Sequence, residues 1–228
     1  MNFQNGEILY FDKPLTWTSF DLVNKVRWLI SRHLGEKIKV GHAGTLDPLA
    51  TGVMILTTGK ATKQIETLQA GVKEYIATLR LGATTPSFDL EHEIDQTFEF
   101  EHITREMVEE KLRDFVGEIW QTPPVYSAVK VNGKRAFDYA RKGAEVELKP
   151  KLLVIDEIEI LEFDNPKLVI RVVCSKGTYI RALARDIGVA LGSGAHLTAL
   201  QRTKIGDVRL ENCTTWEEFE KLLSAQIT

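Results

Sequence analysis

The sequence predicts an α+β protein built on a mixed sheet. Several segments alternate apolar and polar residues with the period of a β-strand, and others repeat apolar residues at helical spacing. These segments are interleaved without strict strand–helix–strand alternation, which favours a mixed sheet over a doubly wound parallel one. With 43% hydrophobic and 27% charged residues, the chain has the composition of an ordinary globular protein with a real core.

The N-terminal third predicts strand, helix, strand, helix and strand in that order. A strand is expected at 8–14, and a helix at 18–35 that begins at Thr18 or Ser19 and stops at Gly35. A short apolar strand at 53–58, a helix at 61–69 and an alternating strand at 73–85 follow. The buried stripe of the first helix is expected to contain Phe20, Val23, Val26 and Ile30. One face of the strand at 73–85 is expected to contain Tyr75, Ala77, Leu79 and Leu81.

The remainder of the chain predicts further helices and a strand pair. We expect a helix at 104–116 that stops at Gly117, and a short basic helix that stops at Gly143, after a proline pair that forbids helix. Two strands at 151–163 and 167–175 are expected to pair through a tight turn. The last two helices are predicted at 178–192 and from Thr215, where Thr215 and Glu218 have capping-box spacing. The buried stripe of the first of these is expected to contain Ile180, Leu183, Ile187 and Leu191.

The charged residues are segregated along the chain. The net charge is −3, but the segment 89–118 alone has eleven acidic and three basic residues, so the rest of the chain is net positive. The segment 130–142 has five basic residues against one acidic residue. This distribution is compatible with a polyanionic ligand on one side of the molecule, although solvated charge runs are commoner than binding faces.

Other sequence features favour a cytoplasmic protein. Cys174 and Cys213 are too few for a disulfide framework and lack metal-ligand spacing, so reduced thiols are expected. The N-terminus has no secretory signal pattern, and no apolar run approaches the length needed to span a bilayer.

The segment KVGHAGTLDPLATGVMILTTG, residues 39–59, places four glycines around a single carboxylate, Asp47. It lacks the Lys-Ser/Thr pair of a P-loop and the spacing of a dinucleotide-binding fingerprint. Two interpretations remain from the residues alone: a turn-rich connection that Asp47 caps, or a catalytic carboxylate held on a stiff loop. The second is chemically reasonable because Pro48 restricts Asp47 and an ionised carboxylate can act as a nucleophile. A sheltered carboxylate would need a partner cation.

Four stretches, in this order, resemble the TruB family of tRNA pseudouridine synthases. They are GHAGTLDPLATGVMIL, KEY, QTPPVYSAVKVNGKRAFDYAR and KGTYIRALARDIG, and they span most of the chain. The resemblance implies a largely antiparallel sheet flanked by helices, with a basic thumb-like insertion at about 121–150. It implies isomerisation of uridine 55 in the T-loop of tRNA, with a flipped target base and without cofactor or metal. Whether the carboxylate attacks C1′, attacks C6 or assists a glycal route stays open.

The resemblance also assigns roles to individual residues. Asp47 matches the nucleophile, Tyr75 the tyrosine that lies against the target uracil, and Arg181 the arginine that pairs with the aspartate. The interpretation of Arg185, one turn further along, is a solvated helix arginine. The candidate RNA contacts are His42, Lys130, Lys134, Arg135, Arg141 and Lys142. Lys13 and Pro14 match a structural pair near the active site.

Two departures from the family and two alternative functions belong beside this interpretation. The stretch KPLTWTSF lacks a glycine that many relatives have, and the chain leaves no room for a C-terminal PUA domain, so we expect one catalytic domain over 1–228, acting as a monomer. One alternative is a non-catalytic RNA chaperone that binds the tRNA elbow. The other is a nucleotide-binding protein that uses the glycine-rich loop. Pseudouridine mapping separates the first from an enzyme, and calorimetry with ATP or NAD tests the second.

Overall fold

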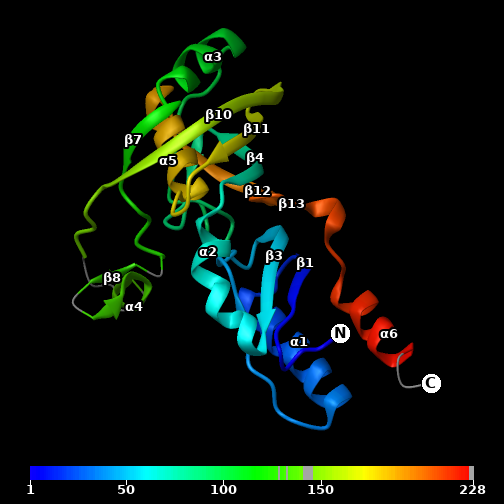
Figure 1. The fold of residues 1–228 in the computed structure, drawn as a ribbon. Helices are drawn as coiled ribbons and strands as arrows, with labels where there is room; N and C mark the ends of the chain where they lie inside the picture. The colour runs from blue at the N-terminus through cyan, green and yellow to red at the C-terminus, as the bar shows by residue number, and fades with distance from the viewer. Residues whose placement is uncertain (128, 132, 141–145, 226–228) are drawn as a thin grey trace. The chain divides into compact units, whose positions relative to one another are not determined.

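The computed structural model describes residues 1–127, 129–131, 133–140 and 146–225. The chain divides into two compact units (Figure 1). The first contains Met1–Tyr75 and the described residues from Gln201 onward, and the second contains Ile76–Leu200. Strands β4 (Lys73–Leu81) and β12 (Ala195–Ile205) contribute residues to both units.

The first unit contains most of the N-terminal elements and the C-terminal helix. Its strand order is β1-β3-β12-β4, with β2 paired to β3 and β13 paired to β12. Strands β1 and β3 are antiparallel from Ile8↔Thr57 to Lys13↔Gly52. The other elements of this unit are β1 (Ile8–Lys13), α1 (Ser19–Leu34), β2 (Val40–His42), β3 (Ala50–Thr58), η1 (Gly59–Gln64), α2 (Ile65–Ala70), β13 (Val208–Arg209), η2 (Leu210–Asn212) and α6 (Trp216–Ala225).

The second unit has the strand order β12-β4-β11-β10-β7. Its long antiparallel pair, β10 with β11, is interrupted by two register shifts, and β7 pairs with the start of β10 (Figure 1). Helix α3 packs against β10 and α5. The elements of this unit are β5 (Ala83–Thr84), β6 (Gln96–Thr97), α3 (Arg105–Arg113), β7 (Gly117–Gln121), β8 (Lys130–Val131), β9 (Lys134–Arg135), α4 (Ala136–Ala140), β10 (Lys151–Asp164), β11 (Lys167–Cys174) and α5 (Ile180–Ala190).

Local sequence explains where the helices begin. Thr18 forms a capping box with Asp21 at the start of α1, and Gly35 closes this helix in the left-handed conformation. Thr215 and Glu218 exchange the two hydrogen bonds of the capping box predicted for α6. Helix α3 ends at Arg113, a few residues before the predicted stop, and Gly117 instead begins β7 with a φ of 99°.

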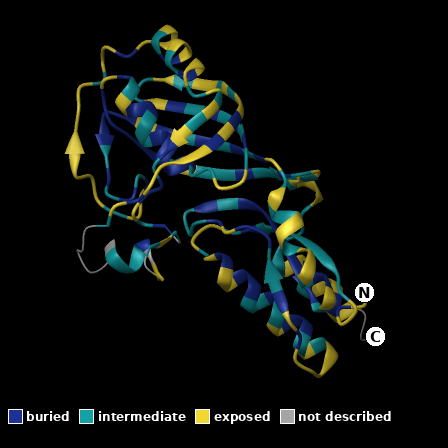
Figure 2. Cartoon of the chain, turned by 60° about the vertical axis from the view of Figure 1, so that its left-hand side comes forward, coloured by how far each residue is buried: buried dark blue, intermediate teal, exposed yellow. Residues whose placement is uncertain are grey.

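Buried, intermediate and exposed residues are interspersed along the helices and strands (Figure 2). The core follows the predicted periodicity except at Phe20. Tyr75, Ala77, Leu79 and Leu81 are all buried on β4, as expected. Phe20 was placed in the buried stripe of α1, and this prediction is wrong because its side chain is 61% exposed. Leu22 and Leu29 complete the stripe of α1 in its place. In the core of the first unit, the ring of Phe219 of α6 packs edge to face against the rings of Phe3 and Phe11, at centroid distances of 6.3 and 5.3 Å.

Candidate active site

Asp47 lies in the first unit, on the loop that connects β2 to β3. The two strands pair from Val40↔Thr58 to His42↔Leu56, and the amide of Ala50 donates to the Asp47 carbonyl as β3 begins. The Asp47 side chain is partly buried, so the loop presents it at the surface of the unit. The Pro48 that follows Asp47 limits the backbone freedom of this pair.

Hydrogen bonds from three separate elements hold the backbone of this loop. Arg202 of β12, which is 1% exposed, donates to the carbonyls of Val53, Thr45 and Gly44 at 2.9, 3.2 and 3.2 Å. The Ser19 hydroxyl, at the start of α1, donates to the Leu46 carbonyl at 3.0 Å and accepts from the Leu46 amide at 2.8 Å.

The third anchor holds the C-terminal side of Asp47. The amide of Thr16 donates to the Pro48 carbonyl at 2.9 Å, and the Lys13 ammonium approaches the same carbonyl at 3.4 Å. The backbone is therefore fixed on both sides of Asp47. Such an arrangement can hold a reacting group in one orientation before substrate binds.

Gly52 has a packing role in this assembly. Its φ is 106°, and a Cβ built on it would lie 2.2 Å from the Arg202 carbonyl oxygen. The glycine therefore lets β3 approach the backbone of β12 closely, and this approach positions the Arg202 guanidinium under the loop. The close neighbour of Gly52 is therefore the protein's own backbone.

Lys13 is a fully buried cation near Asp47. Its ammonium donates to the carbonyls of Pro14 and Trp17, which fixes the turn after β1. Burial lowers the pKa of Lys13 to about 8, and the negative charge of Asp47 opposes this shift. Lys13 is therefore still mostly protonated at neutral pH and contributes positive charge close to the Asp47 carboxylate.

The other candidates in the first unit are His42 and Tyr75. His42 ends β2 and is partly buried, and burial lowers the pKa of its imidazole, so the neutral form dominates at pH 7. Tyr75 points to the buried face of β4 and is 8% exposed. Pro14 follows Lys13 in the turn that closes under the loop.

Arg181 lies in the second unit, in the first turn of α5, and is 5% exposed. Its guanidinium donates to the carbonyls of Ser87 and Tyr126 at 3.1 and 2.9 Å. Its Nε lies 3.7 Å from Oδ2 of Asp89, which is itself 5% exposed. Arg181 thus connects the loop around residue 87 to Tyr126, near the start of the basic insertion. The pairing of Arg181 with Asp47 joins residues of different units and stays a prediction.

Sequence reasoning missed Asp89 and Arg202. In the sequence, Asp89 is only one of the eleven acidic residues of the segment 89–118, yet it is buried beside Arg181 while most of that segment is exposed. A weak signal was available, because a buried carboxylate requires a cation and Arg181 had already been selected. The loop also contains Phe88 at a φ of 61°, an uncommon conformation for a residue with a side chain.

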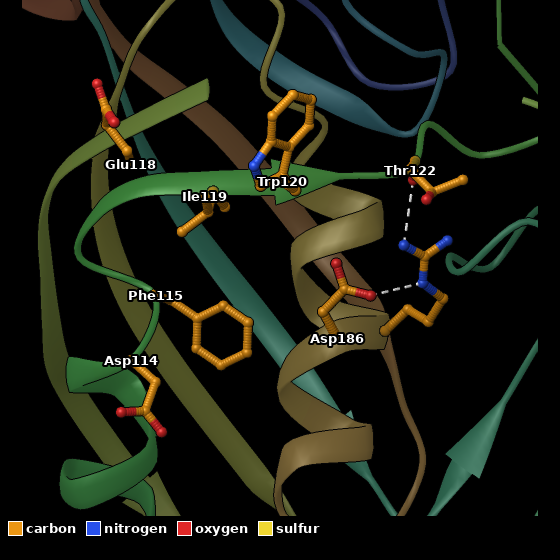
Figure 3. A pocket seen from close by; sticks show the side chains of 8 residues that line it. Asp114, Phe115, Glu118, Ile119, Trp120, Thr122 and Asp186 are labelled. Carbon is orange, nitrogen blue, oxygen red and sulfur yellow. Dashed lines mark hydrogen bonds and ion pairs between the residues drawn. The ribbon is translucent and has the colours of Figure 1, made fainter. Parts of the chain in front are cut away.

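Arg185 corrects another expectation. It was interpreted as a solvated helix arginine, but it donates to the Thr122 carbonyl at 3.1 Å and pairs with Asp186 at 2.8 Å (Figure 3). Its guanidinium also lies 5.1 Å from the centroid of the Phe88 ring. It borders a surface hollow of about 390 Å³ lined by Asp114, Phe115, Glu118, Ile119, Trp120, Thr122 and Asp186. Arg185 therefore supports both the residue 88 loop and the start of the basic insertion.

The described part of the basic insertion is a small hairpin followed by a short helix. Lys130 of β8 pairs with Arg135 of β9, and Lys134 lies beside the Gly133 turn. The side chains of Lys130 and Lys134 are exposed, as phosphate contacts would be. Arg141 and Lys142 lie outside the described residues. The amides of Ala136 and Phe137 donate to the carbonyls of Val129 and Ser127, which folds α4 back onto the hairpin strand.

Two further findings concern the described residues as a set. They contain no group of three or more His, Cys, Asp or Glu side chains arranged to hold a metal ion. None of their helices is both long and apolar enough to cross a bilayer.

Comparison with known proteins shows the family of the chain. Residues 31–180 match the family model described as TruB family pseudouridylate synthase (N terminal domain), and residues 181–227 match tRNA pseudouridylate synthase B C-terminal domain. A relative from Phocaeicola vulgatus, named tRNA pseudouridine synthase B, is 70% identical over 99% of this chain and 97% of its own. A relative of the same name from Parabacteroides distasonis is 68% identical, over 100% of this chain and 97% of its own.

Solved structures show the same fold. The chain superposes on one titled as a Cbf5-Nop10-Gar1 complex with a TM-score of 0.73 and 31% identity, over 97% of this chain and 55% of that one. A second, titled as an H/ACA RNP bound to a substrate RNA containing 2′-deoxyuridine, gives a TM-score of 0.69 and 28% identity, over 96% and 53%. The chain thus spans about half the length of these solved chains. Both comparisons confirm the α+β fold class.

The chain belongs to the TruB family of pseudouridylate synthases. It is an enzyme of the isomerase class, which confirms the prediction drawn from the four sequence stretches.

Proposed function

We propose that this enzyme converts uridine 55 in the T-loop of tRNA to pseudouridine, with Asp47 as the nucleophile. The observation that carries the proposal is the anchoring of the Asp47 loop by Arg202, Ser19 and Lys13. A turn that merely connects two strands does not need two buried cations to fix its carbonyls. The name tRNA pseudouridine synthase B, borne by relatives of 66–70% identity, supports tRNA as the substrate.

The reaction is an isomerisation that balances without cofactor. The bond from N1 of uracil to C1′ of ribose breaks, the base turns while it stays bound, a bond from C5 to C1′ forms, and the proton on C5 is lost while N1 gains one. Attack of Asp47 on C1′, attack on C6 and assistance of a glycal route all use an ionised carboxylate at this position. The buried ammonium of Lys13 lies close enough to Asp47 for the two charges to interact.

The other residues have roles in presenting the base. The uridine must leave the stacked T-loop, which costs a few kcal/mol, and contact with an aromatic ring offsets part of that cost. We assign this contact to Tyr75 and the occupation of the vacated position to His42. We assign to Arg181, which Asp89 and two carbonyls hold in place, the role of the cation that pairs with Asp47. Lys130 and Lys134, with Arg135, Arg141 and Lys142, are assigned to phosphate contacts.

The assignment is tested by incubating the purified protein with unmodified tRNA transcript and mapping pseudouridine. Conversion at position 55 is expected for the wild type and none for Asp47→Asn, which keeps the size of the side chain. The Asp47→Asn protein should still bind the tRNA, and this result separates loss of chemistry from loss of recognition. Conversion by Asp47→Asn at the wild-type rate excludes Asp47 as nucleophile. We further propose that the enzyme acts as a monomer in the cytoplasm.

A further inference from the structure

The outer face of α1 exposes two large aromatic side chains. Phe20 is 61% exposed and Trp28 is 50% exposed, although both lie on a helix with a complete buried stripe of its own. At 100° per residue, positions 20 and 28 lie about 80° apart around the helix and therefore share one broad face. Neither ring contributes to the core of the unit, so packing does not explain them.

Each of these rings lies under a basic side chain. The guanidinium of Arg27 is 5.9 Å from the centroid of Phe20, and that of Arg32 is 5.3 Å from the centroid of Trp28. Within the described chain neither arginine has a carboxylate at ion-pair distance, and Arg27 only donates to the side-chain oxygen of Asn24. Lys25 also lies over Trp28, at 5.1 Å from the ring centroid, but it pairs with Glu220 at 3.6 Å and its ammonium is 4.2 Å from the Trp216 centroid, so its charge is already engaged within the unit. We name Phe20, Arg27, Trp28 and Arg32 the α1 strip.

An arginine above an aromatic ring is suited to bind phosphate. Stacking on the ring fixes the planar guanidinium, while its N–H groups stay available at the edge for a bidentate contact. An exposed aromatic ring in turn provides a stacking surface for any base, whatever its sequence. Basic residues interleaved with exposed aromatic residues on one face have the chemistry of a surface that tracks a nucleic-acid backbone.

The α1 strip begins next to the catalytic loop. Ser19, hydrogen bonded to Leu46 next to Asp47, is the residue directly before Phe20. At 1.5 Å per residue, Arg32 lies about 18 Å further along the helix axis than Phe20. The strip therefore leads away from the loop over a distance that several nucleotides of backbone would cover.

We propose that the α1 strip is a second RNA-binding surface of this enzyme, on which an unpaired stretch of the RNA substrate lies. Arg27 and Arg32 contact phosphates, and Phe20 and Trp28 stack on bases other than the one that is modified. This inference rests on the proposed function, since it extends the same RNA substrate beyond the active site. The net positive charge of the strip favours a polyanion over an apolar protein partner.

The test uses the full chain and an unmodified tRNA transcript as the probe. The dissociation constant is measured at several salt concentrations for the wild type, for Arg27→Gln/Arg32→Gln and for Phe20→Ala/Trp28→Ala. The arginine pair should reduce the slope of log K against log salt by about 1.4, roughly 0.7 for each phosphate that is no longer neutralised. The aromatic pair should weaken binding at least about fivefold with little change in slope.

Matched controls come from the second unit. Arg105 and Arg113 are two exposed arginines on one helix, α3, and Trp120 is 71% exposed on β7. The variants Arg105→Gln/Arg113→Gln and Trp120→Ala should bind tRNA with the wild-type affinity and slope. Circular dichroism and the unfolding midpoint establish that each variant is folded.

A second measurement does not depend on any variant. Wild-type protein crosslinked to tRNA that contains 4-thiouridine should give crosslinked peptides from residues 20–32. Crosslinks confined to other segments, or strip variants with wild-type affinity and slope, overturn the inference. Aromatic variants that change sedimentation of the protein but not its affinity for tRNA assign the strip to self-association and also overturn it. A wild type that binds tRNA without forming pseudouridine refutes the proposed function alone.

Discussion

Arg181 and Asp89 form an ion pair, with 3.7 Å between Nε and Oδ2, in which both side chains are more than nine-tenths buried. Removal of one member of such a pair leaves the other charge buried without compensation, which costs about 3–5 kcal/mol. We expect Asp89→Ala to lower the free energy of unfolding by about this amount and to reduce the single-turnover rate, because the orientation of Arg181 is lost. Denaturant unfolding and rapid-quench kinetics measure the two effects.

Glu93→Gln is the matched control for Asp89, because Glu93 is exposed and lies four residues away on the same acidic segment. It should retain the wild-type stability and rate. An Asp89→Ala protein with wild-type stability would show that the two carbonyl contacts are sufficient to hold Arg181.

Lys13 predicts a pH dependence of the reaction. Burial lowers its pKa from 10.5 to about 8, so in the folded protein Lys13 is charged below about pH 8 and neutral above it. Between pH 8 and 10.5 the unfolded chain holds the proton and the folded chain does not, so this group makes stability rise with pH in that window. The chemical step should respond in the opposite direction, because the positive charge near Asp47 disappears. We expect the single-turnover rate to fall as pH rises through about 8.

Lys13→Arg tests whether Lys13 causes the fall in the single-turnover rate at high pH, because a guanidinium stays charged throughout this pH range. Provided the variant folds, its rate should show no fall near pH 8. If the rate of Lys13→Arg falls at the same pH as that of the wild type, a group other than Lys13 titrates there.

We expect replacement of Arg202 to lower both the stability of the protein and its catalytic rate. Arg202→Ala removes the donor to two carbonyls of the Asp47 loop and one carbonyl of β3, and each buried carbonyl left without a donor costs about 1–3 kcal/mol. We expect a large loss of stability and, in the molecules that stay folded, a fall in kcat that exceeds any change in KM. Arg202→Lys retains the positive charge and can still donate a hydrogen bond to one of these carbonyls, so it should recover part of kcat. An equal loss of kcat in both variants would mean that charge alone is insufficient.

A comparison of Gly52 with Gly35 tests whether β3 approaches the backbone of β12 closely at Gly52. Both have positive φ values, 106° and 72°, but a Cβ at Gly52 would overlap the Arg202 backbone whereas a Cβ at Gly35 would meet nothing within 4 Å. Gly35→Ala should cost about 1–2 kcal/mol from backbone strain alone. Gly52→Ala should cost clearly more and also reduce activity. Equal costs in thermal unfolding would refute the close approach of the two strands.

The basic insertion predicts a salt effect. Lys130→Ala/Lys134→Ala should weaken tRNA binding and reduce the salt slope by roughly 0.7 for each phosphate that these lysines neutralise. Lys111→Ala/Lys167→Ala, placed on α3 and β11, should leave the slope unchanged. A slope that is unchanged in the first variant as well would exclude this hairpin from the RNA interface.

The sequence predicted those elements whose periodicity reflects a single buried face. Strands β4 and β11 alternate clearly, β10 alternates only between its two register shifts, and the stripe of α5 was correct in all four of its residues. Strand β12 was missed because two of its inward positions are His196 and Arg202, which disrupt the apolar alternation. Phe20 was misplaced because helical spacing alone cannot distinguish a ring at the edge of a buried stripe from one within it.

The residues of the candidate site likewise fall into those that the sequence reveals and those that it does not. Asp47 and Lys13 stand in short local patterns, so the sequence singled them out. Asp89 and Arg202 are defined by partners about 90 to 160 residues away, and only the folded backbone brings those partners together. Buried polar residues of this kind resemble ordinary surface residues when only their neighbours in sequence are considered.

The anchoring of the Asp47 loop by Arg202 has a consequence for biosynthesis. The bonds to Val53, Thr45 and Gly44 span 149, 157 and 158 residues of chain. The ribosome therefore makes the Asp47 loop well before it makes Arg202, the residue that anchors the loop. Until residue 202 has left the ribosome, the nascent polypeptide contains Asp47 but lacks the hydrogen bonds that hold its loop, so the anchored conformation can form only after that point.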